Sequence, residues 1–141
     1  MRIMAVDYGD SRTGAAVSDD TASLAGAAWV IREKELSATA RTIANEAAAH
    51  QVGVIVVGYP KNMNGTIGPR AEKSAQLADL IRGLCDIKVV LWDERLTTMG
   101  AHRILSDTGR HGKKRKEVID AVAATLILEG YLDYLAGAKK Q

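Results

Sequence analysis

The sequence predicts an α/β fold with a mixed five-stranded sheet and helices on both of its faces. Apolar, strand-like segments at residues 2–7, 13–18 and 25–31 are joined by short links, which favours antiparallel pairing. The second half alternates helical segments with apolar strands at 52–57 and 87–92, and this alternation indicates a parallel sheet covered on both faces. We expect the first strand to be central and to lie beside the fourth.

Cap and turn residues locate the helices in the middle of the chain. Ser37 is a candidate N-cap for an Ala-rich helix that ends near His50. Residues 58–68 form a predicted loop rich in Gly and Asn, and Pro69 suits the first turn of a helix that ends near Leu84. These two predicted helices therefore flank the apolar fourth strand in the sequence.

The C-terminal part of the chain is predicted to be helical with one interruption. Helices are expected at about residues 98–105 and 117–135, and a polar, basic loop at 108–116 separates them. A chain of 141 residues is of ordinary size for one domain. We therefore expect a single domain over residues 1–138, followed by a polar tail at 139–141.

Composition excludes several classes of protein. Hydrophobic residues make up 47% of the chain and charged residues 26%, as in a globular protein, and the formal charge of +2 does not by itself argue for nucleic-acid binding. Cys85 is the single cysteine, which excludes an intramolecular disulfide and a cysteine-based zinc site. The sequence shows neither a membrane-spanning apolar run nor the pattern of a signal peptide, so we expect a cytoplasmic protein without membrane contact.

Acidic residues stand at three places where apolar segments end. Asp7 ends the first strand, Asp93 and Glu94 follow the last strand, and Asp120 lies in an otherwise apolar stretch of the C-terminal helix. A carboxylate at the edge of a core is costly to desolvate, so it is normally paired or bound to a cation. Ligands of open α/β sheets bind in the crevice beyond the carboxyl ends of the parallel strands. We therefore predict that Asp7, Asp120 and one acid of the 93–94 pair converge within a few ångströms, in a solvent-open crevice, on a divalent metal.

Asp93 and Glu94 are adjacent, and this limits what both can do. Successive side chains of an extended segment point to opposite faces, so the two cannot both face one crevice while the strand persists. One of them is expected to bind the metal, while the other caps the next helix or pairs with Arg95. The sequence leaves open which acid takes which part.

Two loops carry candidate phosphate-binding groups. Gly9, in the turn after the first strand, permits a close approach of a phosphate to backbone N–H groups. In the loop at 58–65, glycines and asparagines, Asn62 among them, allow exposed N–H donors, and Lys61 adds a cation. This loop lacks the ending of a Walker loop, which argues against nucleoside triphosphate binding of that type. An ordinary connecting loop is the alternative, and Met63 is expected to fold back on the core.

A dense run of cations precedes the helix that carries Asp120. Between residues 108 and 116 it comprises Arg110, Lys113, Lys114, Arg115 and Lys116. A basic loop beside an acidic crevice suits a phosphodiester substrate, because its cations would neutralise the backbone. A solvated loop without a ligand is the alternative interpretation.

Taken together, these segments resemble the successive motifs of the YqgF/RuvX family, whose members are described as pre-16S rRNA nucleases and as Holliday-junction-resolvase-like proteins. The resemblance covers essentially the whole chain, in the family's order, through residues 7–19, 58–65, 93–98 and 116–124. It implies a ribonuclease H-like fold and a cytoplasmic, metal-dependent nuclease, expected to be an endonuclease that matures the 5′ end of pre-16S rRNA in ribosome biogenesis.

The resemblance also implies roles for individual residues. The catalytic candidates are Asp7, Glu94, Asp120 and Asp93, of which the first three would hold Mg²⁺ or Mn²⁺. Resolvases of this fold carry an acid just after the fourth strand, where this chain has Gly58, so an acid of the 93–94 pair would substitute from the neighbouring strand. The candidates for placing and neutralising substrate phosphates are Gly9, Arg12, Lys61, Asn62, Arg95, Arg110, Lys113, Lys114, Arg115 and Lys116.

Other functions remain open at this point. The chain could be a Holliday-junction resolvase-like DNA endonuclease, or a non-catalytic RNA-binding assembly factor that keeps the fold and cleaves nothing. A sugar-kinase-like or actin-like ATPase is discounted, because those proteins need a second domain to enclose nucleotide. The expected partner is structured RNA, namely pre-rRNA, with branched DNA as the alternative. We expect a monomer or a weak dimer, because the sequence offers no obvious helix for a dimer interface.

Overall fold

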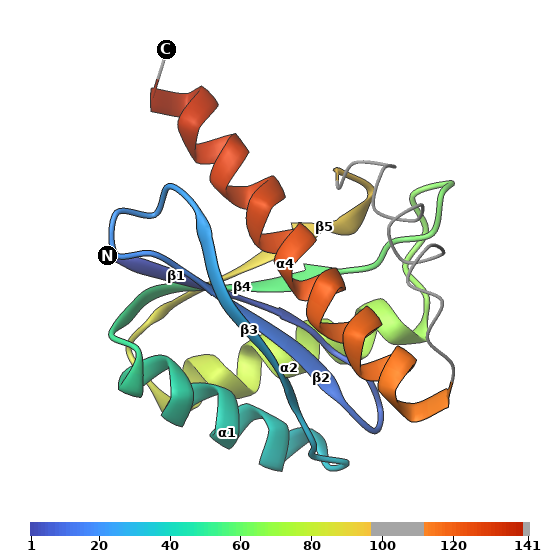
Figure 1. The fold of residues 1–141 in the computed structure, drawn as a ribbon. Helices are drawn as coiled ribbons and strands as arrows, with labels where there is room; N and C mark the ends of the chain where they lie inside the picture. The colour runs from blue at the N-terminus through green and yellow to red at the C-terminus, as the bar shows by residue number, and fades with distance from the viewer. Residues whose placement is uncertain (97–111, 140–141) are drawn as a thin grey trace.

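The computed structural model of the chain describes residues 1–96 and 112–139 (Figure 1). Its elements are, in chain order, β1 (Arg2–Asp7), β2 (Thr13–Ser18), β3 (Ala25–Ile31), α1 (Leu36–Ala49), β4 (Val52–Tyr59), α2 (Pro69–Leu84), β5 (Lys88–Asp93), the short 3₁₀ turn η1 (Glu94–Leu96) and α4 (Gly112–Lys139). The predicted strands are all present, and α2 has the predicted bounds. The helix expected at 98–105 lies outside the described residues.

The sheet has five strands in the order β3-β2-β1-β4-β5. Pairing is antiparallel between β1 and β2 and between β2 and β3, as the short links predict. It is parallel between β1 and β4 and between β4 and β5. The mixed sheet with β1 at its centre, beside β4, is therefore confirmed.

Helices cover both faces of this sheet (Figure 1). Alternate residues of β1 are buried in two separate cores. Met4 faces α1 and α2, where Ile43 and Leu77 are fully buried with it. Ile3 faces the other side, where it packs with Ile127 of α4. Burying each of these large side chains contributes about 1.5–3 kcal/mol, so both layers stabilise the sheet. The acidic end of β1 is thereby fixed between two packed helical layers.

Gly14 of β2 lets α4 come unusually close to the sheet. A Cβ at this position would overlap the backbone carbonyl oxygen of Asp120. Gly14 is also the register partner of Asp7 across the β1–β2 pair. The missing side chain therefore places Asp120 over the strand next to Asp7, on the same face of the sheet.

Helices α1 and α4 begin earlier than predicted. The N-cap of α1 is Glu35, whose side chain makes no capping hydrogen bond to the described residues, so Ser37 is not the cap. Packing of Leu36 against the core explains the earlier start of α1. The backbone at 112–116, expected in a loop, belongs to α4, and its lysines and arginine are good helix formers. The same helix continues to Lys139, four residues beyond its predicted end.

Met63 is a further correction, because its side chain is 88% exposed and does not fold back on the core. The loop that carries it is closed by its own hydrogen bonds, so it needs no apolar anchor. Among the described helices, none combines the length and apolar character needed to cross a membrane.

Candidate active site

Asp7 ends β1 as a buried carboxylate on the face that α4 covers. Its side chain is 10% exposed, and one carboxylate oxygen lies 3.8 Å from Nη2 of Arg70. Burial raises the pKa of Asp7 from 3.8 to about 6; the charge of Arg70 opposes this rise and the charge of Asp120 adds to it. The folded protein therefore holds an acid that is costly to ionise, at the carboxyl end of the central strand.

Glu94 reaches the same place from the end of β5. An ideal Cβ at Gly58, near the end of β4, would lie 2.9 Å from Oε2 of Glu94. Glu94 therefore fills the space into which a side chain at position 58 would project. Burial, and next the charge of Asp7, raise the pKa of Glu94 from 4.5 to about 7. Two desolvated carboxylates that repel one another thus meet above the ends of β1, β4 and β5.

Asp93 points elsewhere and is bound to Arg95. The Nε of Arg95 lies 3.1 Å from each carboxylate oxygen of Asp93, and its Nη2 lies 2.8 Å from Oδ2. These hydrogen bonds hold the pKa of Asp93 below its usual value. The expected pairing of one of the adjacent acids with Arg95 is present, and it is Asp93 that pairs. Glu94 lies close enough to Asp7 for the charge of Asp7 to raise its pKa.

Asp120 enters the site from α4 and is held there by an arginine. The Nε of Arg12, in the turn between β1 and β2, donates a hydrogen bond of 2.8 Å to Oδ2 of Asp120. Both side chains are about one quarter exposed. A charge-assisted hydrogen bond of this kind stabilises the carboxylate in its present orientation. Arg12, expected to contact phosphate, is thus also the partner of a catalytic candidate.

The three acids lie on one face of the sheet, but they do not form a preformed metal cluster. Across residues 1–96 and 112–139, no group of three His, Cys, Asp or Glu side chains is close enough to hold a metal ion. The described residues therefore lack the predicted cluster of three carboxylates placed to share a metal ion, and Asp120 is bound to Arg12. The donor chemistry of Asp7 and Glu94 nevertheless fits a divalent cation such as Mg²⁺, since hard cations prefer carboxylate oxygens and would relieve their repulsion.

An open cavity of about 550 Å³ lies at the turn that follows β1, and Asp120 is one of its lining residues. Gly9 lines it, and its charged lining residues are the cations Arg12, Arg70 and Lys73 and the acids Asp10 and Asp120. The turn at Gly9 is tight, because a Cβ there would overlap the carbonyl oxygen of Arg12. Sequence analysis missed Arg70 and Lys73. The available signal was their spacing of three residues just after Pro69, which places both on one face of the first helical turns.

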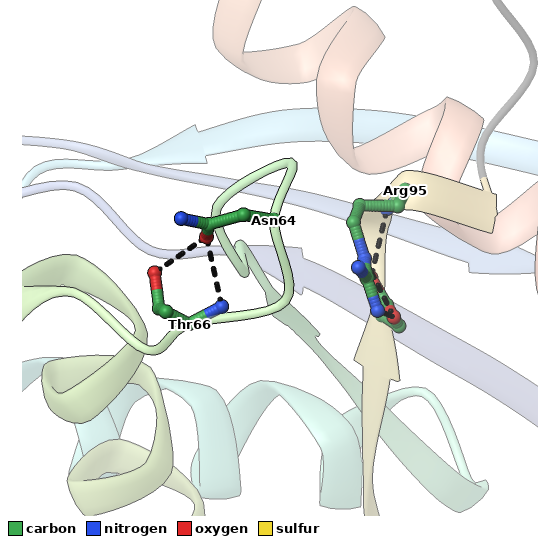
Figure 2. Close-up of polar contacts among 4 residues, drawn as sticks. Asn64, Thr66 and Arg95 are labelled. Carbon is green, nitrogen blue, oxygen red and sulfur yellow. Dashed lines mark hydrogen bonds and ion pairs between the residues drawn. The ribbon is translucent and has the colours of Figure 1, made fainter.

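The loop after β4 uses its polar groups internally. The side-chain amide of Asn62 donates a hydrogen bond of 2.9 Å to Oγ1 of Thr66, and Oδ1 of Asn64 accepts bonds from the backbone N–H and hydroxyl of Thr66. Lys61 lies over the ring of Tyr59, with Nζ 5.8 Å from the ring centroid. Figure 2 shows the Asn64–Thr66 bonds and the neighbouring Arg95. Asn62 therefore holds the loop together, and Arg95 is already engaged by Asp93.

The remaining basic candidates are those of the cationic run between residues 108 and 116. Arg110 lies outside the described residues. Residues 113–116 belong to the first turns of α4, so their backbone is helical rather than a loop. This helix leads directly to Asp120, which keeps the cations and the acid on one continuous element.

Comparison with known proteins identifies the family of the chain. The model of a family described as "RuvX: Holliday junction resolvase" matches residues 1–134. The chain belongs to the RuvX family. It is 43% identical over 141 residues to a Ruminiclostridium cellulolyticum protein, covering 99% of each chain. It is 46% identical over 134 residues to a Halothermothrix orenii protein, covering 95% of this chain and 96% of that one. Both relatives are named "Putative pre-16S rRNA nuclease".

Solved structures show which fold this RuvX-family chain adopts. RuvC of T. thermophilus, in complex with a Holliday junction substrate, has a TM-score of 0.63 at 9% identity, covering 95% of this chain and 96% of that one. Fowlpox virus resolvase, in complex with Holliday junction DNA, has a TM-score of 0.60 at 15% identity, covering 96% and 99%. At these identities the likeness concerns the fold alone, and the ribonuclease H-like architecture is confirmed.

Proposed function

We propose that this protein is a metal-dependent nuclease, and specifically an endonuclease that cuts pre-16S rRNA near its 5′ end during ribosome biogenesis in the cytoplasm. The support from relatives is the name carried by RuvX-family proteins that are 43–46% identical over nearly the whole chain. The support from the molecule is an acidic site at the strand ends, near a cavity that three cations, Arg12, Arg70 and Lys73, line together with Asp10 and Asp120.

The observation that carries the proposal is the meeting of Asp7 and Glu94. Both carboxylates are desolvated and have a raised pKa, and the charge of Asp7 adds to the cost of ionising Glu94, so the pair destabilises the fold when both are charged. A site kept at such a cost is a candidate for function rather than for structure. Carboxylates that repel one another at the carboxyl ends of parallel strands suit cation binding.

Asp7 and Glu94 would hold Mg²⁺ or Mn²⁺ through their carboxylate oxygens, and Asp120 would join them when Arg12 releases it. A bound divalent cation supplies activation of the attacking water and stabilisation of the leaving oxygen in phosphodiester hydrolysis. Arg12 would exchange its single hydrogen bond to Asp120 for hydrogen bonds to a substrate phosphate, which can accept two from one guanidinium. This exchange couples substrate binding to completion of the acidic site.

The basic start of α4 would bind the RNA backbone next to this site. Lys113, Lys114, Arg115 and Lys116 precede Asp120 on one helix. Phosphate neutralisation by such residues strengthens binding in a salt-dependent manner without selecting sequence. Recognition of pre-rRNA would then depend on the shape and flexibility of the strand that enters the crevice.

A second candidate function is the resolution of branched DNA. It is favoured by the family description and by the likeness of the fold to RuvC. A resolvase must cut two strands symmetrically, and a closed two-fold dimer is the usual way to pair active sites. We propose a monomer or weak dimer that cuts one strand, so the two functions differ in both assembly and products.

The test compares labelled pre-16S rRNA leader with a four-way DNA junction in the presence of Mg²⁺ or Mn²⁺. Wild type is expected to cut the RNA at discrete internal sites, and Asp7→Asn is expected to cut neither substrate. Asp133→Asn, an exposed acid on α4, removes the same charge and serves as the matched control.

The products distinguish the alternatives. If the protein sediments as a dimer and makes paired, symmetric cuts in the junction, it is a resolvase and the proposed action on RNA is wrong. Equal cutting by wild type and Asp7→Asn would exclude the proposed site. Tight RNA binding without cleavage under either metal would favour a non-catalytic assembly factor.

A further inference from the structure

The cavity that Asp120 lines has a second wall, formed by the first turns of α2. Arg70 and Lys73 contribute to this wall, and Arg12 and Asp120 also line the cavity. The side chains of Arg70 and Lys73 are 61% and 51% exposed, so solvent and ligands can reach them. Two cations thus lie on one helical face and open to a cavity that the catalytic candidate Asp120 also lines, an arrangement that suits an anionic ligand.

Arg70 is positioned by the backbone next to Asp7. Its Nη2 donates a hydrogen bond of 3.1 Å to the carbonyl oxygen of Tyr8 and lies 3.8 Å from Oδ1 of Asp7. A guanidinium carries five N–H donors, and only this one hydrogen bond to Tyr8 is formed with the described residues. Arg70 therefore has donors to offer a ligand within a few ångströms of the proposed metal ligand.

Lys73 is held one helical turn further along by Asp10. Its Nζ lies 3.0 Å from Oδ1 of Asp10, an exposed acid in the turn after β1. The N-cap of the same helix is Gly68, which has no side chain that could cap the first N–H groups. An uncapped helix start adds partial positive charge to the cavity wall. Arg70 and the helix start thus favour an anion on the α2 side, and Lys73 adds to this where a phosphate takes the place of Asp10, which lines the same cavity.

The size of the cavity limits what this anion can belong to. Its volume of about 550 Å³ is in the usual range for small-molecule sites and suits one nucleotide rather than a duplex. We propose that Arg70 and Lys73 bind a backbone phosphate of one single-stranded nucleotide, and so position the strand being cut against Asp7. The inference rests on the proposed nuclease function for the identity of the strand. Arg70 and Lys73 are positioning residues, and the ligand chemistry is a phosphodiester.

The test measures binding of short single-stranded RNA and DNA of the same sequence to the full chain, in EDTA so that binding is separated from cleavage. Arg70→Ala/Lys73→Ala is expected to weaken binding about tenfold or more, as for loss of hydrogen bonds to charged groups. It should also lower the slope of log affinity against log salt by about 0.7, the value for neutralising one phosphate of a single strand. Arg41→Ala, an exposed arginine on α1, is the matched control and should keep the wild-type slope.

Two further variants keep the proposal testable if the double variant folds poorly. Arg70→Lys should recover part of the affinity, because it keeps the charge, and Arg70→Gln should not. In single-turnover cleavage, the variants of Arg70 and Lys73 should need a higher protein concentration to reach half of the maximal rate. The maximal rate itself should change little. If the variants bind RNA and DNA with equally weakened affinity, the group that Arg70 and Lys73 recognise is the phosphate. If only RNA binding weakens, they recognise the 2′-hydroxyl and the phosphate proposal is wrong.

Failure of this inference differs from failure of the nuclease proposal. If the variants of Arg70 and Lys73 bind with wild-type affinity and salt slope while Asp7→Asn abolishes cleavage, the phosphate subsite is wrong and the nuclease stands. If wild type cuts nothing but these variants lose single-strand binding, the subsite stands and the nuclease proposal is wrong.

Discussion

Glu94 occupies the space that Gly58 leaves empty. An ideal Cβ on Gly58 would lie 2.9 Å from Oε2 of Glu94 and 2.6 Å from Cδ1 of Ile127, although Gly58 lies on β4 and Glu94 follows β5. Glycine near the end of β4 therefore allows the acid at the end of β5 to reach Asp7. This packing gives a physical reason why an acid that follows β5 can stand in for a side chain at position 58 of β4.

Gly58→Ala should displace Glu94 and reduce nuclease activity by an order of magnitude or more. The added methyl group must push aside Glu94 or Ile127, and such overpacking typically costs about 1–3 kcal/mol. Activity on labelled RNA and thermal stability should be measured together. We expect the activity to fall more than the small loss of stability explains, because the carboxylate moves away from Asp7.

Gly53→Ala on the same strand is the matched control. The three atoms nearest to a Cβ there all belong to the side chain of Met1, which is 68% exposed and can move. This variant should retain activity. Equal activity of Gly58→Ala and Gly53→Ala would show that the position of Glu94 does not matter for cleavage.

The fold was largely predictable, because periodicity and link length act locally. The five strands, their mixed pairing and α2 follow from apolar patterns and turn residues in the sequence. The start of α4 was not predictable in the same way, because its first residues are polar cations that suit either a loop or a helix. Propensity alone does not decide such a segment.

The candidate site was predictable in its acids but not in their pairing. Positions at strand ends identify Asp7 and the pair of acids at 93–94 without choosing between the two, since carboxyl ends of parallel strands share one edge, and apolar neighbours identify Asp120. The bond between Arg12 and Asp120 joins residues 108 positions apart, and no local pattern encodes it. The same is true of Arg70, which reaches Asp7 only because the fold places the start of α2 beside the end of β1.

Without divalent metal, stability should fall as pH rises from about 4 to about 7. The pKa of Asp7 is raised to about 6 and that of Glu94 to about 7, so the folded state binds protons more tightly than the unfolded state. Their stabilising contribution is complete below the unfolded values near 4 and is lost as pH passes through the folded values. For Asp7 alone this amounts to about 3 kcal/mol.

Urea denaturation in EDTA at several pH values measures this effect. Asp10 and Asp93 have lowered pKa values, so they act in the opposite sense, but only below their ordinary value of 3.8. Saturating Mg²⁺ or Mn²⁺ should flatten the decline, since the cation stabilises the ionised acids. Constant stability over this pH range in EDTA would contradict the burial of these two carboxylates.

Asp7→Asn should raise the melting temperature in metal-free buffer near neutral pH. The amide removes a desolvated charge that repels Glu94, and a gain of 1 kcal/mol corresponds to roughly 3–5 °C in a domain of this size. Stabilisation by added Mn²⁺ should meanwhile be smaller than in wild type. Asp133→Asn, which changes an exposed acid on α4, should show neither effect.

The basic start of α4 should contribute to RNA affinity rather than to the chemical step. Replacing Lys113, Lys114, Arg115 and Lys116 by Ala should reduce the slope of log affinity against log salt by about 0.7 for each phosphate that these cations neutralise in wild type. Single-turnover cleavage at saturating protein should change much less. A quadruple variant with the full wild-type salt slope would mean that these cations remain solvated in the complex.

Arg12→Ala should have opposite effects on the two ligands of the site. The Nε of Arg12 now lies 2.8 Å from Oδ2 of Asp120, and a cation can recruit this acid only after the bond breaks. Hydrogen bonds to charged groups contribute about 1.5–3 kcal/mol, so removing the arginine should tighten Mn²⁺ binding about tenfold in the absence of nucleic acid. RNA affinity should fall, because the same arginine is proposed to bind a substrate phosphate.

Arg32→Ala provides the matched control for this substitution. Arg32 pairs with Glu117, three residues before Asp120 on α4, so the substitution removes an arginine–carboxylate pair without touching the site. Calorimetric titration with Mn²⁺ and a fluorescence titration with RNA should show little change for this variant. If Arg12→Ala weakens both Mn²⁺ and RNA binding, Arg12 only supports the local structure, and the exchange of Asp120 from arginine to cation does not occur.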